Sequence, residues 1–177
     1  MSYNFGSIGT NVFISPKSSI YGAEHIFIGN NVRIDDFVII SAKEPVIIGN
    51  YVHIAPYCGL YGACGIEMKD FSGMSSRVAI YSISDDYSGE SLTNPTVPDE
   101  YKHLVKGKVT IGRHVDIGCG SLILPGVEIG DGSSVMAMSL LNKSFECGFI
   151  IGGNPARKIK ERSQKIFELE KEFLGKL

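Results

Sequence analysis

The chain has 177 residues, of which 44% are hydrophobic, and a formal net charge of −2 at pH 7. This length fits one domain with an ample core, and the near-neutral charge gives no indication of a nucleic acid or a membrane surface as partner. No apolar stretch approaches the roughly 18 residues that span a bilayer. The first residues also lack the basic start and apolar run of a signal peptide, so we expect a cytoplasmic protein.

Four cysteines are widely spaced, and none of them forms a C-x-x-C pair: Cys58, Cys64, Cys119 and Cys147. This spacing argues against a zinc site. We expect no bound metal and interpret the cysteines as small buried hydrophobic residues.

From the first residues onward, an aliphatic residue occurs at every sixth position, in groups of three. The triplets are Ile8, Ile14 and Ile20; Ile28, Ile34 and Ile40; Ile48, Ile54 and Leu60; Met68, Met74 and Ile80; Ile111, Ile117 and Ile123; Ile129, Val135 and Leu141. The first four begin twenty residues apart, and the last two eighteen apart. The fifth position of each unit is small or β-branched, and Gly or Asn often follows the aliphatic residue, where it suits a tight corner.

A six-residue unit does not fit the helical period of 3.6, but it accommodates a short strand and a corner. Three units close a triangular coil, and stacked coils bring equivalent aliphatic residues together. The sequence therefore predicts a mainly β fold, a parallel β-helix of about six coils over residues 1–154. A sandwich of short strands is the alternative, but it would not require one fixed register throughout.

The register also predicts a column of outward side chains, made of the residue before the middle member of each triplet. The column holds Phe13, Arg33, His53, Gly73, Asp116 and Ser134. We therefore expect His53 and Asp116 to share one face, one coil apart.

The repeat stops after Ile80 and resumes in step at Ile111, which predicts an excursion loop over residues 81–110. An insertion at one corner leaves the stacking on either side intact, and loops on rigid scaffolds often carry function. Two prolines, Pro95 and Pro98, stiffen the loop. Its tyrosines can either pack the loop or lie against a sugar ring.

Residues 155–177 follow the last repeat and predict a helical tail. Pro155 suits the first turn of a helix. From about Ser163 onward, apolar residues recur at spacings of three and four, as in an amphipathic helix that covers the open end or the flank of the prism. These residues are Ile166, Leu169, Phe173 and Leu177.

The repeat register, the stretch "IGCGSLILPGVEIGDG" and the closing "IIGGNPARKIKER" resemble the left-handed β-helix (hexapeptide-repeat) acyltransferases. Among these, the chain is similar over essentially its whole length to sugar O- and N-acetyltransferases of cell-surface polysaccharide synthesis. The resemblance implies coils that wind left-handed, against the usual crossover preference. It also implies a homotrimer, with acetyl-CoA as co-substrate in a groove between two subunits along the C-terminal coils.

The coenzyme needs a narrow slot for its pantetheine arm and cations for its phosphates. Small residues in the last coils, expected to face outward, would let an extended ligand approach the backbone, and the resemblance places residues 139–144 and 153–157 beside it. The predicted coenzyme contacts are Gly118, Ala137, Ser139, Lys143, Asn154, Pro155, Arg157 and Lys158.

The resemblance also implies a general base, because maltose and galactoside acetyltransferases carry a histidine in an "IYTATHP"-like segment. This chain has "IYSISDD" there, which puts Asp85 in the place of that histidine. A free aspartate has a low pKa, near 3.9, so Asp85 would need Asp86 or burial to raise it. His103 of the loop, or His53 or His114 from a neighbouring subunit, are alternative bases. A further alternative has no protein base, with the two aspartates binding substrate hydroxyls.

The predicted function is transfer of an acetyl group to a hydroxyl or amino group of a sugar or nucleotide-sugar, in bacterial surface polysaccharide biosynthesis. The missing histidine favours an amine, which attacks before it loses its proton, whereas the resemblance favours a hydroxyl. An N-acetyltransferase specific for a nucleotide-linked amino-deoxysugar is the first alternative. A non-catalytic hexapeptide scaffold and a carbonic anhydrase relative with a three-histidine metal site are the other classes considered. The expected acceptor contacts are Tyr81, Ser84, Asp86, His53, His114 and Asp116.

Overall fold

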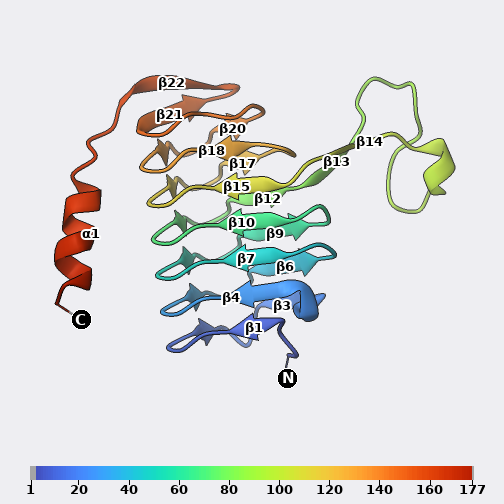
Figure 1. Ribbon diagram of the computed structural model, residues 1–177. Helices are drawn as coiled ribbons and strands as arrows, with labels where there is room; N and C mark the ends of the chain where they lie inside the picture. Colours follow the sequence, from blue (N-terminus) through green and yellow to red (C-terminus); the bar gives the residue numbers. More distant parts are fainter. Residues whose placement is uncertain (1–2, 177) are drawn as a thin grey trace.

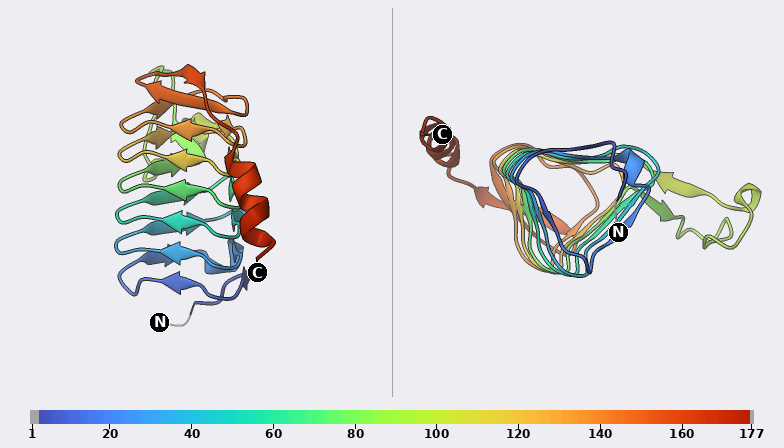
Figure 2. Two further views of the ribbon diagram at one scale, coloured as in Figure 1. Left: turned by 90° about the vertical axis from the view of Figure 1, so that its left-hand side faces the viewer. Right: turned by 90° about the horizontal axis from the view of Figure 1, so that it is seen from below.

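The chain winds into a left-handed parallel β-helix with three faces, here described from a computed structural model that covers residues 3–176. Seen along its axis, the helix is a triangular prism (Figure 2). One corner carries a long hairpin, and another is flanked by the C-terminal helix (Figure 1).

Face A consists of β1 (Ser7–Ile8), β4 (Ile26–Ile28), β7 (Val46–Ile48), β10 (Ile66–Met68), β15 (Val109–Ile111) and β18 (Glu128–Ile129). Face B consists of β2 (Phe13–Ile14), β5 (Arg33–Ile34), β8 (His53–Ile54), β11 (Gly73–Met74), β16 (Asp116–Ile117), β19 (Ser134–Val135), β21 (Phe149–Gly153) and β22 (Ala156–Glu161). Face C consists of β3 (Ser19–Tyr21), β6 (Ile39–Ala42), β9 (Gly59–Gly62), β12 (Ala79–Tyr81), β17 (Leu122–Ile123) and β20 (Leu140–Leu141).

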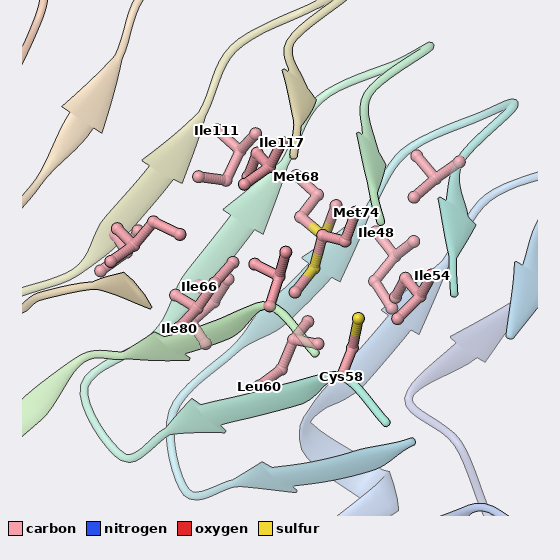
Figure 3. Packing of buried hydrophobic residues seen from close by; sticks show 14 of the residues in the cluster. Ile48, Ile54, Cys58, Leu60, Ile66, Met68, Met74, Ile80, Ile111 and Ile117 are labelled. Atoms are coloured by element: carbon pink, nitrogen blue, oxygen red, sulfur yellow. The ribbon is translucent and has the colours of Figure 1, made fainter. Parts of the chain in front are cut away.

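The strand pairing confirms the predicted register in all six triplets. The first members of the triplets pair in one column, from Ile8 to Ile129, and the second and third members do so on the other two faces. The aliphatic side chains of the inner coils are fully buried and stack along the axis (Figure 3). Each buried isoleucine stabilises the fold by about 1.5–3 kcal/mol.

The predicted parallel β-helix of about six coils is confirmed, and the structure extends it to about seven turns. Phe145 pairs with Ile129, and Ile151 pairs with Val135, so a partial seventh coil closes the top of the prism. Phe145 follows Leu141 by four residues instead of six, and this shortened corner hides the seventh coil from the repeat pattern.

Pro155 does not begin a helix. The chain reverses there, and β22 runs antiparallel to β21, so that Gly153 pairs with Ala156. The helix α1 (Ile166–Leu174) begins eleven residues after Pro155 and runs along the corner between faces A and B (Figure 1). It therefore covers the flank and not the open end. Leu177, the last residue of the predicted helical pattern, lies outside the described residues.

The corner beneath α1 is built from residues with left-handed backbone. Tyr51, Phe71 and His114 have φ values of 57°, 58° and 58°, a conformation that bulky residues seldom adopt. Their rings stack in one column, with centroids 4.7 Å apart for Tyr51 and Phe71 and 5.0 Å apart for Phe71 and His114. The sequence pattern predicts Gly or Asn at such corners and did not predict this column of aromatic rings.

The excursion leaves face C after β12 and returns at β15, at the corner between faces C and A (Figure 1). Its base is an antiparallel hairpin of β13 (Ile83–Asp85) and β14 (Leu104–Lys106), and its outer part contains the 3-10 helix η2 (Asp99–Tyr101). β12 and β17 pair directly across the point of insertion, which confirms that the stack continues past it. Within residues 3–176, no helix has the length and apolarity needed to cross a bilayer.

Candidate active site

A cavity of about 660 Å³ lies between the base of the excursion and face C. It contains groups from the prism wall and from the hairpin. Its lining residues are Lys43, Tyr61, Ala63, Cys64, Tyr81, Ile83, Ser84, Asp85, Asn94, Pro95, Asp99, Lys102, Leu104 and Lys106. The cavity is thus the place where the excursion faces the rigid scaffold.

Asp85 lies in the wall of this cavity. It is the last residue of β13, where it pairs with Leu104, and its side chain is partly buried. Its Oδ1 accepts a hydrogen bond of 3.2 Å from the backbone N–H of Asn94, on the far side of the excursion. The second carboxylate oxygen has no hydrogen-bond partner among residues 3–176, so Asp85 can accept a proton or bind an ammonium group.

Asp86 and His103 are not brought into the cavity. The Asp86 carboxylate accepts hydrogen bonds from the backbone N–H and the hydroxyl of Ser88, at 3.0 and 2.5 Å. Those bonds hold the pKa of Asp86 below its usual value. His103 meets Asp86 through its backbone, where its carbonyl accepts the Asp86 N–H at 3.2 Å. The expectation that Asp86 raises the pKa of Asp85 is therefore not supported by any side-chain contact between the two, because the Asp86 carboxylate bonds to Ser88.

Tyr81 and Tyr61 line the cavity from face C. They occupy equivalent positions on neighbouring coils, and their rings stack with centroids 4.5 Å apart and planes 16° apart. Burial, and then the neighbouring Tyr61, raise the pKa of Tyr81. Ser84, also in the wall, bonds through its hydroxyl to the Tyr87 hydroxyl at 3.2 Å.

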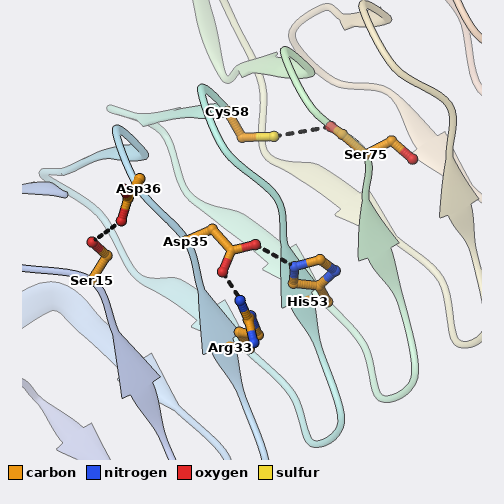
Figure 4. Close-up of polar contacts among 7 residues, drawn as sticks. All are labelled: Ser15, Arg33, Asp35, Asp36, His53, Cys58 and Ser75. Carbon is orange, nitrogen blue, oxygen red and sulfur yellow. Dashed lines mark hydrogen bonds and ion pairs between the residues drawn. The ribbon is translucent and has the colours of Figure 1, made fainter. Parts of the chain in front are cut away.

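His53 lies on face B, away from the cavity. Its Nε2 is 2.7 Å from the carboxylate of Asp35, which also accepts a hydrogen bond of 2.7 Å from Arg33 (Figure 4). Burial alone would raise the pKa of Asp35, but the bonds from His53 and Arg33 hold it below the usual value. The predicted column is confirmed, because Gly73 pairs with His53 on one side and Asp116 on the other.

His114 is a packing residue in this structure. Its side chain is 12% exposed and lies against Phe71, Phe167 and Glu170 at the foot of α1. The expectation that it reaches a substrate or serves as a base from a neighbouring subunit therefore conflicts with its burial under its own helix.

The predicted coenzyme residues fall into several environments. Ser139 is buried, so the expectation that it faces outward is wrong. Its hydroxyl donates to the Met136 carbonyl at 2.6 Å and accepts the Gly153 N–H at 3.2 Å. Ala137 is exposed, and Gly118 stacks so closely on it that a Cβ at Gly118 would lie 2.4 Å from the Ala137 nitrogen. The close stacking of neighbouring coils is therefore sufficient to explain why residue 118 is a glycine.

The charged side chains at the C-terminal end differ in how many ion pairs and hydrogen bonds they already form. Lys158 pairs with Glu146 at 2.5 Å and lies over the Phe149 ring. Arg157 donates to the backbone carbonyls of Pro155 and Ala156 in the exposed turn that Asn154 begins. Lys143 lies 5.8 Å from the centroid of the Phe145 ring, with no ion pair among residues 3–176. Lys143 is therefore the most available of the predicted phosphate-binding cations.

The cysteines are only partly as expected. Cys58 is buried, and burial raises its thiol pKa to about 11. Cys119 and Cys147 are exposed, and Cys64 lines the cavity, so the prediction of burial is wrong for these three. Within the part of the chain that the structure describes, no cluster of three or more His, Cys, Asp or Glu residues could hold a metal.

The sequence missed several residues of the cavity wall. Tyr61 could have been found, because it is twenty residues before Tyr81 and therefore falls in the same column. Lys102 and Lys106 could not have been found, because their approach depends on how the irregular excursion folds back on face C. Lys43 directly follows β6 on the scaffold, and the fold of the excursion is what brings it into the cavity wall.

The chain has relatives among curated proteins. The chain is 47% identical over 170 residues to a dTDP-4-amino-4,6-dideoxy-D-glucose acyltransferase from Escherichia coli, covering 96% of this chain and 88% of the relative. It is 28% identical over 170 residues to WbbJ of E. coli K12, a putative lipopolysaccharide biosynthesis O-acetyl transferase, covering 96% and 77% of the two chains. No protein-family model matches the chain.

Among solved structures, a mutant of AntD, an N-acyltransferase from Bacillus cereus, is 51% identical with a TM-score of 0.95, covering 98% of this chain and 92% of AntD. That structure holds dTDP-4-amino-4,6-dideoxyglucose and coenzyme A, and another AntD structure holds dTDP and 3-hydroxybutyryl-CoA. A maltose O-acetyltransferase from Clostridium difficile, 24% identical with a TM-score of 0.62, covers 90% of this chain and 71% of its own and shares the fold.

Proposed function

Because the chain belongs to the hexapeptide-repeat family of sugar and nucleotide-sugar acyltransferases and takes an acyl-CoA as co-substrate, we propose that it acylates the amino group of a dTDP-linked 4-amino-4,6-dideoxyhexose. The observation that carries this choice is the carboxylate of Asp85 in the wall of the cavity on face C, at the place where the family resemblance implies a histidine. A carboxylate suits an amine acceptor because it pairs with the ammonium form.

In the proposed reaction, Asp85 binds the acceptor ammonium and takes one of its protons. The free amine then attacks the thioester carbonyl. The tetrahedral intermediate collapses with loss of the coenzyme A thiolate, which takes the second proton of the nitrogen as the amide forms, and Asp85 releases the first proton to solvent. Ser84 supplies a hydroxyl in the same wall that can hold the sugar.

The larger setting follows the family resemblance and is part of the proposal. We expect a homotrimer in which acyl-CoA lies between two subunits along the last coils, near Lys143. We also expect a cytoplasmic location and a role in making an acylated sugar for a bacterial surface polysaccharide. Sedimentation equilibrium of the purified chain tests the trimer.

A coenzyme A release assay tests the activity. Acetyl-CoA and 3-hydroxybutyryl-CoA serve as donors, and dTDP-4-amino-4,6-dideoxyglucose serves as acceptor. The matched control is dTDP-6-deoxyglucose, which differs by carrying a hydroxyl in place of the amine. We expect acyl transfer to the amine and none to the hydroxyl. Equal transfer to the hydroxyl sugar, or no release with either acceptor, would contradict the proposal.

A further inference from the structure

Lys102 is an unusual residue in the cavity wall. Its side chain is 7% exposed, yet the structure supplies one ion-pair partner within residues 3–176, the Asp99 carboxylate at 2.8 Å. Asp99 itself is 93% exposed. An ammonium group has three N–H donors, and burying a charge that is incompletely paired is costly. The remaining donors of Lys102 therefore favour an anion inside the cavity.

Two further lysines surround the same space. Lys43 and Lys106 line the cavity and form no ion pair among the described residues. Their charges act at this site, because the hydrogen bond and charge of Lys102, followed by the charges of Lys106 and Lys43, hold the pKa of Asp99 below its usual value. The cavity wall thus has three lysines against two carboxylates, Asp85 and Asp99.

The tyrosine pair adds neutral donors on the scaffold side. Tyr61 and Tyr81 stack side by side on face C, and both line the cavity. A phenol hydroxyl donates one hydrogen bond, so two neighbouring phenols together with three ammonium groups in one cavity wall can serve several acceptor oxygens. That donor set fits phosphate oxygens far better than it fits neutral sugar hydroxyls.

We propose that this cavity binds the diphosphate of the nucleotide-linked acceptor, held by Lys102 and Lys106 of the excursion and by Lys43, Tyr61 and Tyr81 of the scaffold. The inference rests on the proposed function, because it assigns the charged half of that acceptor. Asp85 lies in the same wall, so the sugar attached to the diphosphate reaches it within one cavity. Coenzyme A also carries phosphates, and the experiment must separate the two sources.

Isothermal titration with dTDP, thymidine and coenzyme A, each alone, makes that separation. The test variants are Lys102→Met and Lys106→Met, which keep the length of the side chain and remove its charge. The matched control is Lys108→Met, which removes the same charge two residues further on, where Lys108 is exposed and pairs with Glu67 at 2.5 Å outside the cavity. We expect each test variant to raise the dTDP Kd at least about tenfold and to leave the coenzyme A Kd within about twofold, whereas the control changes neither.

Thymidine reports on the nucleoside alone, so its binding should be unchanged in both test variants. Unchanged dTDP affinity in both variants, no dTDP binding by the wild type, or loss of coenzyme A affinity instead of dTDP affinity would overturn the inference. Lys106 is exposed, so Lys106→Met keeps the test valid if Lys102→Met does not fold. Wild-type acyl transfer measured separately distinguishes the two proposals: an active enzyme with unchanged dTDP affinity in the variants refutes this site and leaves the function standing.

Discussion

Glu170, in the middle of α1, has its carboxylate 2.8 Å from Nε2 of His114, on the corner of the prism beneath the helix. The same carboxylate pairs with Arg113. Only 6% of the Glu170 side chain is exposed, so a buried ion pair and not an apolar residue lies at the centre of the contact between α1 and the β-helix.

Glu170→Ala should loosen α1. Removing one partner of a buried ion pair leaves the other charge uncompensated, and we expect about 3 kcal/mol weaker docking, or about a hundredfold larger open population. Hydrogen exchange of the α1 amides measures this population. Glu172→Ala, at an exposed position of the same helix, is the control and should exchange like the wild type. Equal protection in the two variants would show that the ion pair does not hold the helix.

Asp85→Asn should lower kcat for the amino sugar by about a hundredfold or more, the usual loss for a general base. The control is Asp86→Asn, because Asp86 bonds to Ser88 and lies outside the cavity wall. That variant should stay within about threefold of wild type. Steady-state kinetics with both variants checks the assignment, and a fully active Asp85→Asn enzyme would exclude Asp85 as the base.

Gly118→Ala should destabilise the β-helix. The added Cβ would lie 2.4 Å from the backbone nitrogen of Ala137, and such overpacking costs about 1–3 kcal/mol. Gly73→Ala on the same face is the matched control, because its Cβ would meet nothing closer than 3.7 Å. Urea unfolding of both variants measures the difference. Equal stability would mean that the coils separate easily at Gly118.

Native-state alkylation should distinguish the cysteines. Burial raises the pKa of Cys58 to about 11, and its Sγ lies 3.1 Å from the Ser75 carbonyl (Figure 4). At about pH 8, iodoacetamide should label exposed Cys119 and Cys147 and leave Cys58 unmodified, since only the thiolate reacts. Peptide mass spectrometry reads the sites. Labelling of Cys58 at the rate of Cys119 would contradict the buried position.

Asp35 should make stability depend on pH in acid. Its pKa in the folded protein lies below the unfolded value of 3.8, so its contribution is present above that pH and is lost as the pH falls through the lower folded value. The stability difference between wild type and Asp35→Asn should therefore be constant at neutral pH and shrink below about pH 4. Urea unfolding across this range checks the sign. His53→Ala, which removes one of the bonds to Asp35, should show a smaller change with pH than the wild type.

The β-helix could be predicted residue by residue because its core is periodic. Each aliphatic triplet dictates one turn, and the pairing of Ile54 with Ile34 and Met74 follows from spacing alone. The repeat pattern did not predict the seventh coil, because Phe145 comes two residues too early for the six-residue spacing. A periodic pattern thus predicts repeats well and their ends poorly.

The tail and the site required tertiary information. The apolar pattern correctly predicted a helix after Ser163, but it placed Leu169 on the contact face, where the structure puts Glu170 and leaves Leu169 half exposed. The partners of the Glu170 carboxylate, Arg113 and His114, lie more than fifty residues earlier in the sequence. The residues of the cavity wall were equally hard to predict from the sequence, because Lys102 reaches face C only through the fold of an aperiodic loop.

A hydrogen bond of 3.0 Å from the Gly107 N–H to the Ser82 carbonyl joins the two ends of the excursion just outside the hairpin of β13 and β14. Ser82 is itself buried, with its hydroxyl bonded to the backbone of Cys64 and Tyr61. The chain between these two anchors can therefore change in length at a cost of only about 0.6 kcal/mol per doubling. Recombination can therefore exchange the excursion at junctions beside Ser82 and Gly107 and leave the β-helix unchanged. Related proteins with the same coenzyme-using scaffold can in this way acquire different acceptors without a new fold.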